Sequence, residues 1–371
     1  MSRTRVCIVN PFQHGGGAEF QISLLTAALH AANRFDVWYL THHVAPEIQP
    51  NGYEIVRIGD DDRVPRLGYV TDFVPLYRAL RSLKPHVIYQ RVACGYTGIC
   101  AFYTRQHHRL TRMIWHVAHT TDVTRESLDT GRNILRRRFE KCSVEYGIRR
   151  TDRIVVQTND QDRLLTQNYG RQADAVIPNF HPDAPEQLDK SGPLTVVWIA
   201  NLKLWKRPDV FVRLAQALRD LTGVRFLMLG EAPPADSKWA IELMQSIEAT
   251  PNLEFLGHRS AAEVNQFLAR ASVFVNTSVH EGFPNTFVQA WLRDAVVVSL
   301  SVNPDRVLDS QGVGIHAGTE EGLEKSVRHL LTDPAARTAY AARARAYAQA
   351  THSVRNIGKL TEMIDECAAA A

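Results

Sequence analysis

The sequence predicts an α/β protein made of two doubly wound parallel sheets, each covered by helices on both faces. Three observations support this prediction. The chain has 371 residues, a length typical of two domains. Short apolar runs alternate with longer amphipathic stretches along nearly the whole chain, as in parallel sheets that are buried on both sides. One proline-rich stretch without periodicity, 179–193, interrupts this alternation and is the best candidate for a linker.

The first half begins with an apolar strand and then alternates strands with helices. Its β-branched and aromatic runs predict strands at 5–10, 36–42, 53–59, 86–92, 112–118 and 153–159. Between the earlier strands, amphipathic patterns predict helices at 18–33 and 73–83. A helix between successive strands is the arrangement that parallel pairing requires.

The second half repeats this alternation. Apolar runs predict strands at 194–201, 225–231, 253–258, 272–278, 295–301 and 312–317. The Ala/Arg-rich stretch 334–350 predicts a helix, with Pro334 suited to its first turn. We therefore expect a first domain over 1–180, a second over 181–351, and a C-terminal helix at about 352–371 that packs back on the first. Ligands of open α/β sheets bind at the carboxyl ends of the strands, so a cleft is expected between the two domains.

Composition excludes several classes of protein. Hydrophobic residues make up 45% of the chain and charged residues 22%, which argues against collagen-like or largely disordered proteins. There is no apolar run of membrane-spanning length and no signal-peptide pattern at the start. The cysteines are scattered and odd in number, which indicates buried thiols in a reducing compartment. We expect a cytoplasmic enzyme.

The stretch 278–291, SVHEGFPNTFVQAW, has the most specific pattern. It follows an apolar strand, turns at Gly-Phe-Pro-Asn and continues as a helix from about Thr286, so backbone N–H groups and the helix dipole would favour an anion. Glu281 lies just before the turn, and Gln289 lies about two helical turns further on, where it can face the same cavity. A capped helix with a surface glutamate is the alternative.

A basic turn follows the first strand of the second half. Lys206 and Arg207 precede Pro208, which fits a first helical turn. Two cations oppose the dipole at a helix N-terminus unless an anion lies between them and the amides. The turn therefore indicates a phosphate site, with a solvated basic loop as the alternative.

A glycine-rich turn, PFQHGGGAEFQ at 11–21, follows the first strand. Alone, it indicates only a flexible turn that lets the backbone approach a ligand. Together and in this order, the glycine turn, the N-x-x-x-x-K-R turn and the EGFPN stretch resemble glycosyltransferase family 4, of the GT-B fold with two Rossmann-like domains facing each other across a deep cleft. The resemblance covers essentially the entire chain.

The resemblance implies that the second domain binds a nucleotide-sugar donor and the first an acceptor. Glu281 would then bind sugar hydroxyls, and Thr286 would lie near the diphosphate. Gln289 stands where the family usually has a second glutamate, which binds ribose; its amide keeps an acceptor and loses the charge. The backbone of the turn would contact the sugar through Gly282, Phe283, Pro284 and Asn285.

Other family positions follow in the same way. Lys206 matches the diphosphate-binding lysine, while Asn201 stands in place of an arginine and Arg207 in place of a glycine. We expect Arg207 to replace the lost cation in part, because a guanidinium suits phosphate. The remaining donor contacts implied by the resemblance are a glycine loop facing the phosphate, Gly16 and Gly17, and two strand-end contacts to the nucleotide, Glu231 and His258.

A histidine of the first domain would point at the donor sugar. The resemblance favours His119, with His116 as the competitor and a hydrogen-bonded core histidine as the other possibility. Catalytic roles thus go to His119, Lys206 and Glu281. No D-x-D motif suited to a metal is evident, since the acidic run at 60–62 fits a solvated turn, and the family is metal-independent.

The expected function is that of a retaining, metal-independent hexosyltransferase without a cofactor. It would move a sugar from a UDP- or GDP-linked donor to a glycan or lipid-linked acceptor in bacterial-type envelope polysaccharide or glycolipid synthesis. Family members retain anomeric configuration, commonly explained by front-face attack assisted by the leaving diphosphate. The alternatives are a GT-B nucleotide-sugar epimerase or hydrolase and a non-catalytic nucleotide-sugar-binding scaffold.

The two halves differ in charge. Through residue 178 there are 24 Lys and Arg against 17 Asp and Glu, and after it 19 against 22. Much of the excess lies at 131–153, which predicts either a solvated basic helix or a surface that contacts anionic lipid at the inner membrane face. Nucleic acid is not expected, because the stretch lacks the interleaved aromatic residues of a single-strand platform.

Overall fold

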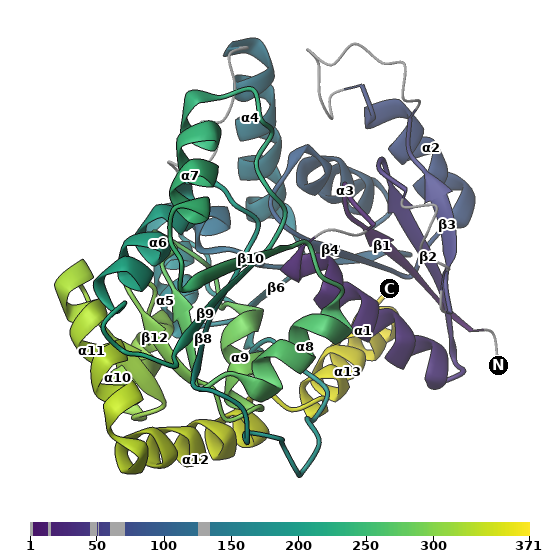
Figure 1. The fold of residues 1–371 in the computed structure, drawn as a ribbon. Coiled ribbons are helices and arrows are strands. Elements are labelled where there is room, and N and C mark those ends of the chain that lie inside the picture. The colour runs from purple at the N-terminus through teal and green to yellow at the C-terminus, as the bar shows by residue number, and fades with distance from the viewer. Residues whose placement is uncertain (1–2, 14–15, 45–49, 51, 60–70, 125–133) are drawn as a thin grey trace. The chain divides into compact units, whose positions relative to one another are not determined.

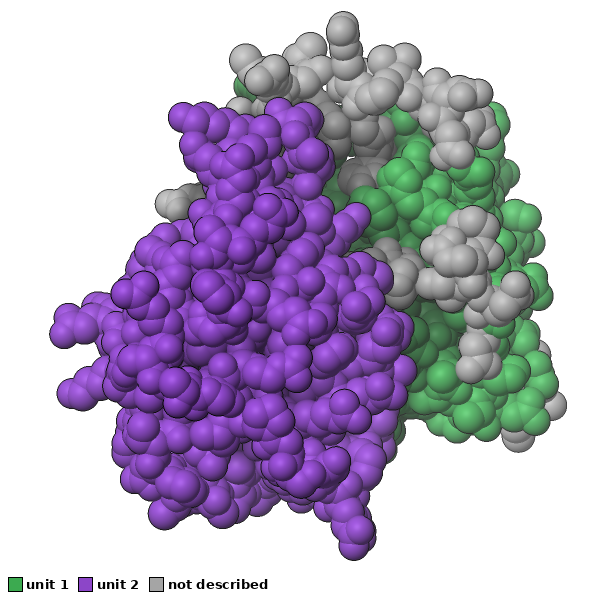
Figure 2. Space-filling view, viewed as in Figure 1, with its two compact units in different colours: residues 1–180, 355–371 green, residues 181–354 purple. Residues whose placement is uncertain are grey.

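The structure is a computed structural model that describes all residues except 1–2, 14–15, 45–49, 51, 60–70 and 125–133. The acidic run at 60–62 and the start of the basic stretch, 131–133, lie outside the described residues. The chain divides into two compact units (Figure 2). Unit 1 comprises Met1–Phe180 and Arg355–Ala371, and unit 2 comprises His181–Val354.

Unit 1 contains a parallel sheet in the order β3-β2-β1-β4-β5-β6-β7 (Figure 1). Its strands are β1 Thr4–Val9, β2 Phe35–Thr41, β3 Glu54–Arg57, β4 Val87–Arg91, β5 Arg112–His116, β6 Arg153–Val156 and β7 Ala175–Val176. Its helices are α1 Gly17–Ala31, α2 Phe73–Leu83, α3 Gly95–Gln106, the 3₁₀ turn η2 Thr120–Val123, α4 Ile134–Arg150, α5 Asn159–Tyr169 and α13 Arg355–Ala369.

Both faces of this sheet are buried, which is why its strands are apolar without alternation. In β1, Val6 and Ile8 belong to the core on one face, together with residues of α1 and α13. Cys7 and Val9 belong to the core on the other face, together with residues of α2 and α3. The chain's last helix, α13, thus returns to unit 1 and contacts α1 (Figure 1).

Unit 2 contains a second parallel sheet, in the order β10-β9-β8-β11-β12-β13. Its strands are β8 Thr195–Ile199, β9 Arg225–Leu229, β10 Leu253–Gly257, β11 Val273–Asn276, β12 Val296–Ser299 and β13 Gly314–His316. Its helices are η3 Leu204–Lys206, α6 Pro208–Ala217, α7 Lys238–Glu248, α8 Ala261–Arg270, α9 Asn285–Trp291, η4 Pro304–Arg306, α10 Val307–Ser310, α11 Glu320–Thr332 and α12 Pro334–Thr351.

Alternate residues of β8 again face two cores. Val196 and Trp198 pack in the core beneath α6, α7 and α11. Val197 packs in the opposite core with residues of α8, α9 and α12. The prediction of two doubly wound α/β sheets is therefore confirmed, and every predicted strand is present. The sequence did not reveal β7, which is two residues long and half exposed at the sheet edge. In the described part of the chain, no helix is both long enough and apolar enough to cross a membrane.

Candidate donor-binding site

The site in unit 2 lies where the strand order reverses. β8 and β11 are neighbours in the sheet, and the connections from them lead to helices on opposite faces. At such a switch point the loops after the two strands separate and leave room for a ligand at the carboxyl edge. The loop after β8 carries Lys206, and the loop after β11 carries Glu281. The fold thus brings together two residues that lie 75 positions apart in the sequence.

Lys206 and Glu281 form a direct ion pair between Nζ and Oε1. Their side chains are 15% and 14% exposed, so the pair is largely removed from water without being sealed. Burial lowers the pKa of Lys206, and the neighbouring Glu281 carboxylate offsets part of that effect. The site therefore holds a poorly hydrated cation and a carboxylate that neutralise each other; chemically, the cation can bind an anion and the carboxylate can accept hydrogen bonds from hydroxyls.

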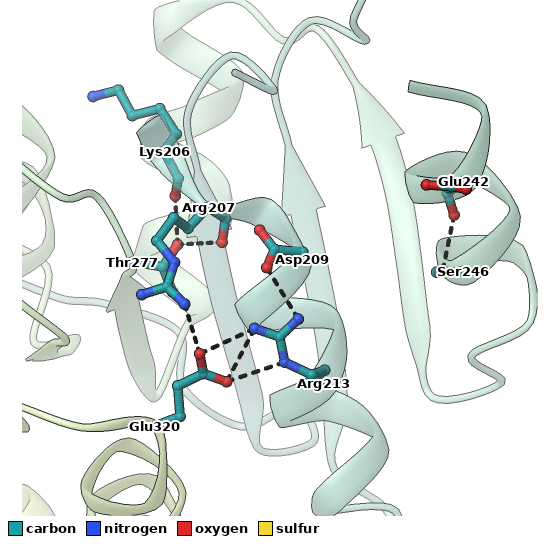
Figure 3. Close-up of polar contacts among 8 residues, drawn as sticks. All are labelled: Lys206, Arg207, Asp209, Arg213, Glu242, Ser246, Thr277 and Glu320. Carbon is teal, nitrogen blue, oxygen red and sulfur yellow. Dashed lines mark hydrogen bonds and ion pairs between the residues drawn. The ribbon is translucent and has the colours of Figure 1, made fainter. Parts of the chain in front are cut away.

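Hydrogen bonds fix the two loops to each other. Trp198 lies on β8 with its side chain in the core, and its indole N–H donates to Oγ1 of Thr277 at 2.8 Å. The Thr277 hydroxyl in turn lies 2.6 Å from the carbonyl oxygen of Lys206 and 2.9 Å from that of Arg207, to which it donates (Figure 3). The backbone N–H of Val279 donates to the carbonyl of Trp205 at 2.9 Å. Lys206 is therefore positioned by a buried chain of contacts that starts in the sheet.

The EGFPN turn is anchored from below by its aromatic residue. Phe283 is only 6% exposed, and its ring packs against Trp291 and His352, with centroids 6.0 and 4.5 Å away. Its side chain is therefore part of the core, which leaves the backbone of Gly282, Phe283, Pro284 and Asn285 to form the turn. Thr286 is half-buried in the first turn of α9.

Gln289, at the predicted ribose position, is 8% exposed on α9. Its Nε2 donates to Oδ1 of Asn265 on α8, at 3.0 Å. This hydrogen bond links α9 to α8 and holds the Gln289 side chain in place.

Asn201 and Glu231, predicted separately, lie in contact. Oδ1 of Asn201 accepts a hydrogen bond from the backbone N–H of Glu231 at 3.2 Å, and the Glu231 carbonyl accepts from Leu202 at 2.9 Å. Directly before Glu231, Gly230 has φ of +152°, and a Cβ there would lie 1.8 Å from the Ala200 carbonyl oxygen. Only glycine allows the ends of β8 and β9 to approach this closely. His258 is exposed directly after β10.

Arg207 has a different environment from Lys206. Its backbone is left-handed, with φ of +49°, and its guanidinium is paired with Glu320 at 2.6 Å (Figure 3). Glu320 is also bound by Arg213, at 3.0 Å. Arg207 lines a hollow of about 550 Å³ beside α6 and α7, whose described lining includes neither Lys206 nor Glu281. In Figure 3 the Lys206 side chain extends away from this group. The proposed role of Arg207 on phosphate stays a prediction that requires its release from Glu320.

In unit 1, the glycine turn lies at the start of α1. Gly16 is the N-cap of this helix and Gly17 its first residue, both exposed, while residues 14–15 of the same turn are outside the described chain. Glu19, in the first turn of α1, accepts a hydrogen bond from the Asn10 side chain at 2.8 Å. This contact ties the helix start to the end of β1.

The two candidate histidines differ in burial. His116 is 0% exposed at the end of β5, and its Nδ1 lies 2.8 Å from the Tyr89 hydroxyl. Burial holds its pKa well below the ordinary value. These properties fit a core histidine. His119 is half-buried and caps η2, so its position is the better suited to a ligand.

The turn around His119 fixes the ring. Nδ1 of His119 accepts a hydrogen bond from the backbone N–H of Thr121 at 3.1 Å, so the neutral ring carries its proton on Nε2. Asp122 accepts from the backbone N–H groups of Ala118 and His119, each at 2.9 Å. Burial raises the pKa of Asp122 to about 6. His119 can therefore present an N–H donor from a turn that one carboxylate holds together.

Two family models match the chain, one over each half. The family described as "Glycosyltransferase Family 4" matches residues 15–182, and "Glycosyl transferases group 1" matches residues 193–333. The chain is a family 4, group 1 glycosyltransferase. Each half of this glycosyltransferase is thus recognised separately, and the two matches meet at the proline-rich stretch.

Individual relatives are more distant. The lipopolysaccharide core biosynthesis glycosyltransferase LpsE of Rhizobium meliloti (strain 1021) is 27% identical over 136 residues, which are 36% of this chain. The match spans about two-fifths of that relative, 39% of its length. Anabaena Alr3699/HepE, solved with UDP and glucose, superposes with a TM-score of 0.78 at 15% identity, over 98% of this chain and 100% of that one. WaaG, a lipopolysaccharide biosynthesis glycosyltransferase, superposes with a TM-score of 0.77 at 14% identity, over 97% and 99%. These structures confirm the GT-B class of fold.

Several residues of the site escaped sequence reasoning. Thr277 and Asn265 contact predicted residues through side-chain hydrogen bonds that no motif records. Asp122 differs, because an acidic residue three positions after His119 is a helix-start signal that the sequence does contain.

Proposed function

We propose that this glycosyltransferase transfers a hexose from a UDP- or GDP-linked donor to a glycan or lipid-linked acceptor of an envelope polysaccharide or glycolipid, with retention of anomeric configuration. The observation that carries the proposal is the Lys206–Glu281 pair at the switch point of unit 2. The printed name of LpsE supports an envelope acceptor, and the UDP and glucose bound to HepE support a nucleotide-sugar donor.

The proposed chemistry uses the pair in an exchange. The donor's diphosphate binds the Lys206 ammonium in place of Glu281, and the released Glu281 carboxylate accepts hydrogen bonds from sugar hydroxyls. As the bond to the leaving diphosphate breaks, negative charge grows on its oxygens and the sugar becomes oxocarbenium-like. A partly dehydrated ammonium stabilises that charge more strongly than a hydrated one would. Lys206 is thus proposed to stabilise the transition state and Glu281 to orient the sugar.

We further propose that His119 donates from Nε2 to the donor sugar, and that the leaving diphosphate takes the acceptor's proton on the same face. Lys206 is the cation proposed for the diphosphate, so the reaction is proposed to need no metal ion. A metal requirement would appear as loss of transfer in EDTA that Mg²⁺ or Mn²⁺ restores.

The function is tested by nucleotide release over a panel of UDP- and GDP-sugars, with and without lipid-linked and glycan acceptors. Acceptor-dependent release of nucleotide by the wild type, lost in Lys206→Met, supports transfer. Release that needs no acceptor indicates hydrolysis or epimerisation instead. Binding seen as a thermal shift, without release under any condition, indicates a nucleotide-sugar-binding scaffold.

We also propose that the basic stretch contacts anionic membrane. Within α4, the exposed side chains include Arg138, Lys141, Arg149 and Arg150, with Phe139 38% exposed among them. Each such cation contributes roughly 1 kcal/mol near an anionic surface. Flotation with phosphatidylglycerol-containing liposomes should recover the protein at low salt and lose it at high salt. Equal recovery with neutral liposomes, or none at low salt, would contradict this.

A further inference from the structure

The residues directly before Lys206 and Glu281 are aromatic, and their rings also contact each other. Trp205 precedes Lys206, His280 precedes Glu281, and the two rings stack with centroids 5.4 Å apart and planes 14° from parallel. The Val279 to Trp205 backbone hydrogen bond continues the same series of contacts. The loops after β8 and β11 are thus joined by a backbone bond, a ring stack and an ion pair in succession.

The indole of Trp205 also contacts the lysine ammonium. Nζ of Lys206 lies 3.9 Å from the centroid of the Trp205 ring, well within the range of a cation–π interaction. The ring is half-buried, and the Lys206 side chain is 15% exposed, so water competes weakly with this contact. The attraction between a cation and a ring face rises when the cation is dehydrated.

In the proposed exchange of partners, the cation–π contact would take over the orientation of the Lys206 ammonium. When Glu281 turns to a sugar hydroxyl, Lys206 loses the carboxylate that orients it. A lysine side chain has four rotatable bonds, and its ammonium would then disperse among several rotamers. The ring of Trp205 remains, because its stacking partner and its backbone bond do not depend on the carboxylate.

We propose that Trp205 is a positioning residue of the donor site: its indole, held against His280, keeps the Lys206 ammonium where it takes the diphosphate after Glu281 has left. This inference rests on the proposed function for its effect on turnover. Its physical core, a ring that holds a pyrophosphate-binding ammonium, can be tested without turnover.

The first test compares Trp205→Leu with Trp205→Phe, and uses Trp239→Leu as a matched control. Trp239 is a half-buried tryptophan of the same unit on α7. Trp205→Leu should raise the donor KM about 3- to 10-fold with a smaller change in kcat, and Trp205→Phe should restore most of the loss, because a phenyl ring keeps a π-face. Equal losses in the leucine and phenylalanine variants, or none in the leucine variant, would overturn the proposal.

The second test observes the lysine directly. In protein labelled with ¹³C at the lysine ε-carbon, the Lys206 signal, assigned by its loss in Lys206→Arg, should be shifted upfield by the ring and should move on titration with inorganic pyrophosphate. Trp205→Leu should abolish the upfield shift and weaken the pyrophosphate response, while Trp239→Leu should leave both unchanged. An unshifted Lys206 signal in the wild type overturns the inference even if sugar transfer is found. If transfer is absent, a shifted and pyrophosphate-sensitive signal supports the inference while the proposed function fails.

Discussion

Removing the carboxylate of Glu281 should tighten the binding of a free nucleoside diphosphate. In the structure this carboxylate is paired with the Lys206 ammonium, so a diphosphate without a sugar must displace it and gains nothing from its release. Glu281→Gln keeps the size of the side chain and deletes the charge. UDP or GDP would then meet an available cation and no longer face a nearby anion.

The size of the effect follows from the burial of the pair. Fully exposed ion pairs contribute about 0.2–1 kcal/mol, and breaking fully buried ones costs about 3–5 kcal/mol. At 15% and 14% exposure the Lys206–Glu281 pair lies between these limits. We therefore expect about 1–2 kcal/mol, which corresponds to a roughly 5- to 30-fold lower Kd for the free nucleotide.

Isothermal titration of UDP and GDP measures this directly, at constant ionic strength. Glu254→Gln is the control, because Glu254 belongs to an exposed ion pair of the same unit, with Arg225 at 2.7 Å, and its loss changes the net charge equally. The control should leave the Kd unchanged, and Lys206→Met should weaken binding at least tenfold. An unchanged or higher Kd in Glu281→Gln would show that the carboxylate does not compete with the diphosphate.

Three further outcomes follow from single contacts. Gly230→Ala should destabilise the protein by about 3 kcal/mol or more, because its Cβ would meet the Ala200 carbonyl oxygen at 1.8 Å. Gly223→Ala is the control, because Gly223 has φ of +85° but nothing within 4 Å of the added Cβ. Thermal melting should show a loss of about 1 kcal/mol of stability for this control, and equal losses of stability in the two variants would contradict the steric argument. Phe283→Ala should lower the unfolding free energy by about 3 kcal/mol and reduce donor affinity, and a variant that melts normally would contradict the anchoring role. Because the pKa of Asp122 is raised to about 6 in the folded state, the pH-dependent part of its contribution to stability is present at low pH and lost as the pH rises through about 6. Asp122→Asn should therefore cost about 1 kcal/mol more at pH 5 than at pH 7.5 by chemical denaturation, and a pH-independent cost would contradict that shift.

The fold could be predicted from the sequence because nearly all strands lie in the same apolar environment. Each central strand is buried on both faces, as Val6 and Cys7 of β1 illustrate, so a short apolar run between polar turns is sufficient evidence. The edge strand β7 lacks that environment and has only two residues, which no periodicity can reveal. The start of helix α9 was predicted to within one residue because Pro284 and the turn before it define that start.

Residues of the candidate site could be predicted from the sequence only where both the residue type and its place after a strand indicate the role. Lys206 and Glu281 were identified by their residue types after two separate strands, and the strand order of the structure shows that those strands are neighbours. The surroundings of Arg207 depend instead on a left-handed backbone and on Glu320, 113 positions later. Such a contact depends on how α6 and α11 pack on the same face, and local spacing does not contain that information. The contacts of Thr277 with the Lys206 loop were hidden for the same reason.

In the proposed function, the Lys206–Glu281 pair of unit 2 is the donor-binding centre of an active sugar transferase. A decisive experiment incubates the protein with isotope-labelled UDP- and GDP-sugars and an extract of lipid-linked and glycan acceptors, and then follows label in the acceptor fraction. We expect labelled product with the wild type and with Glu254→Gln, and at least a hundredfold less with folded Lys206→Met and with folded Glu281→Gln. Label transfer by Lys206→Met at the wild-type rate would show that this pair is not the donor-binding centre.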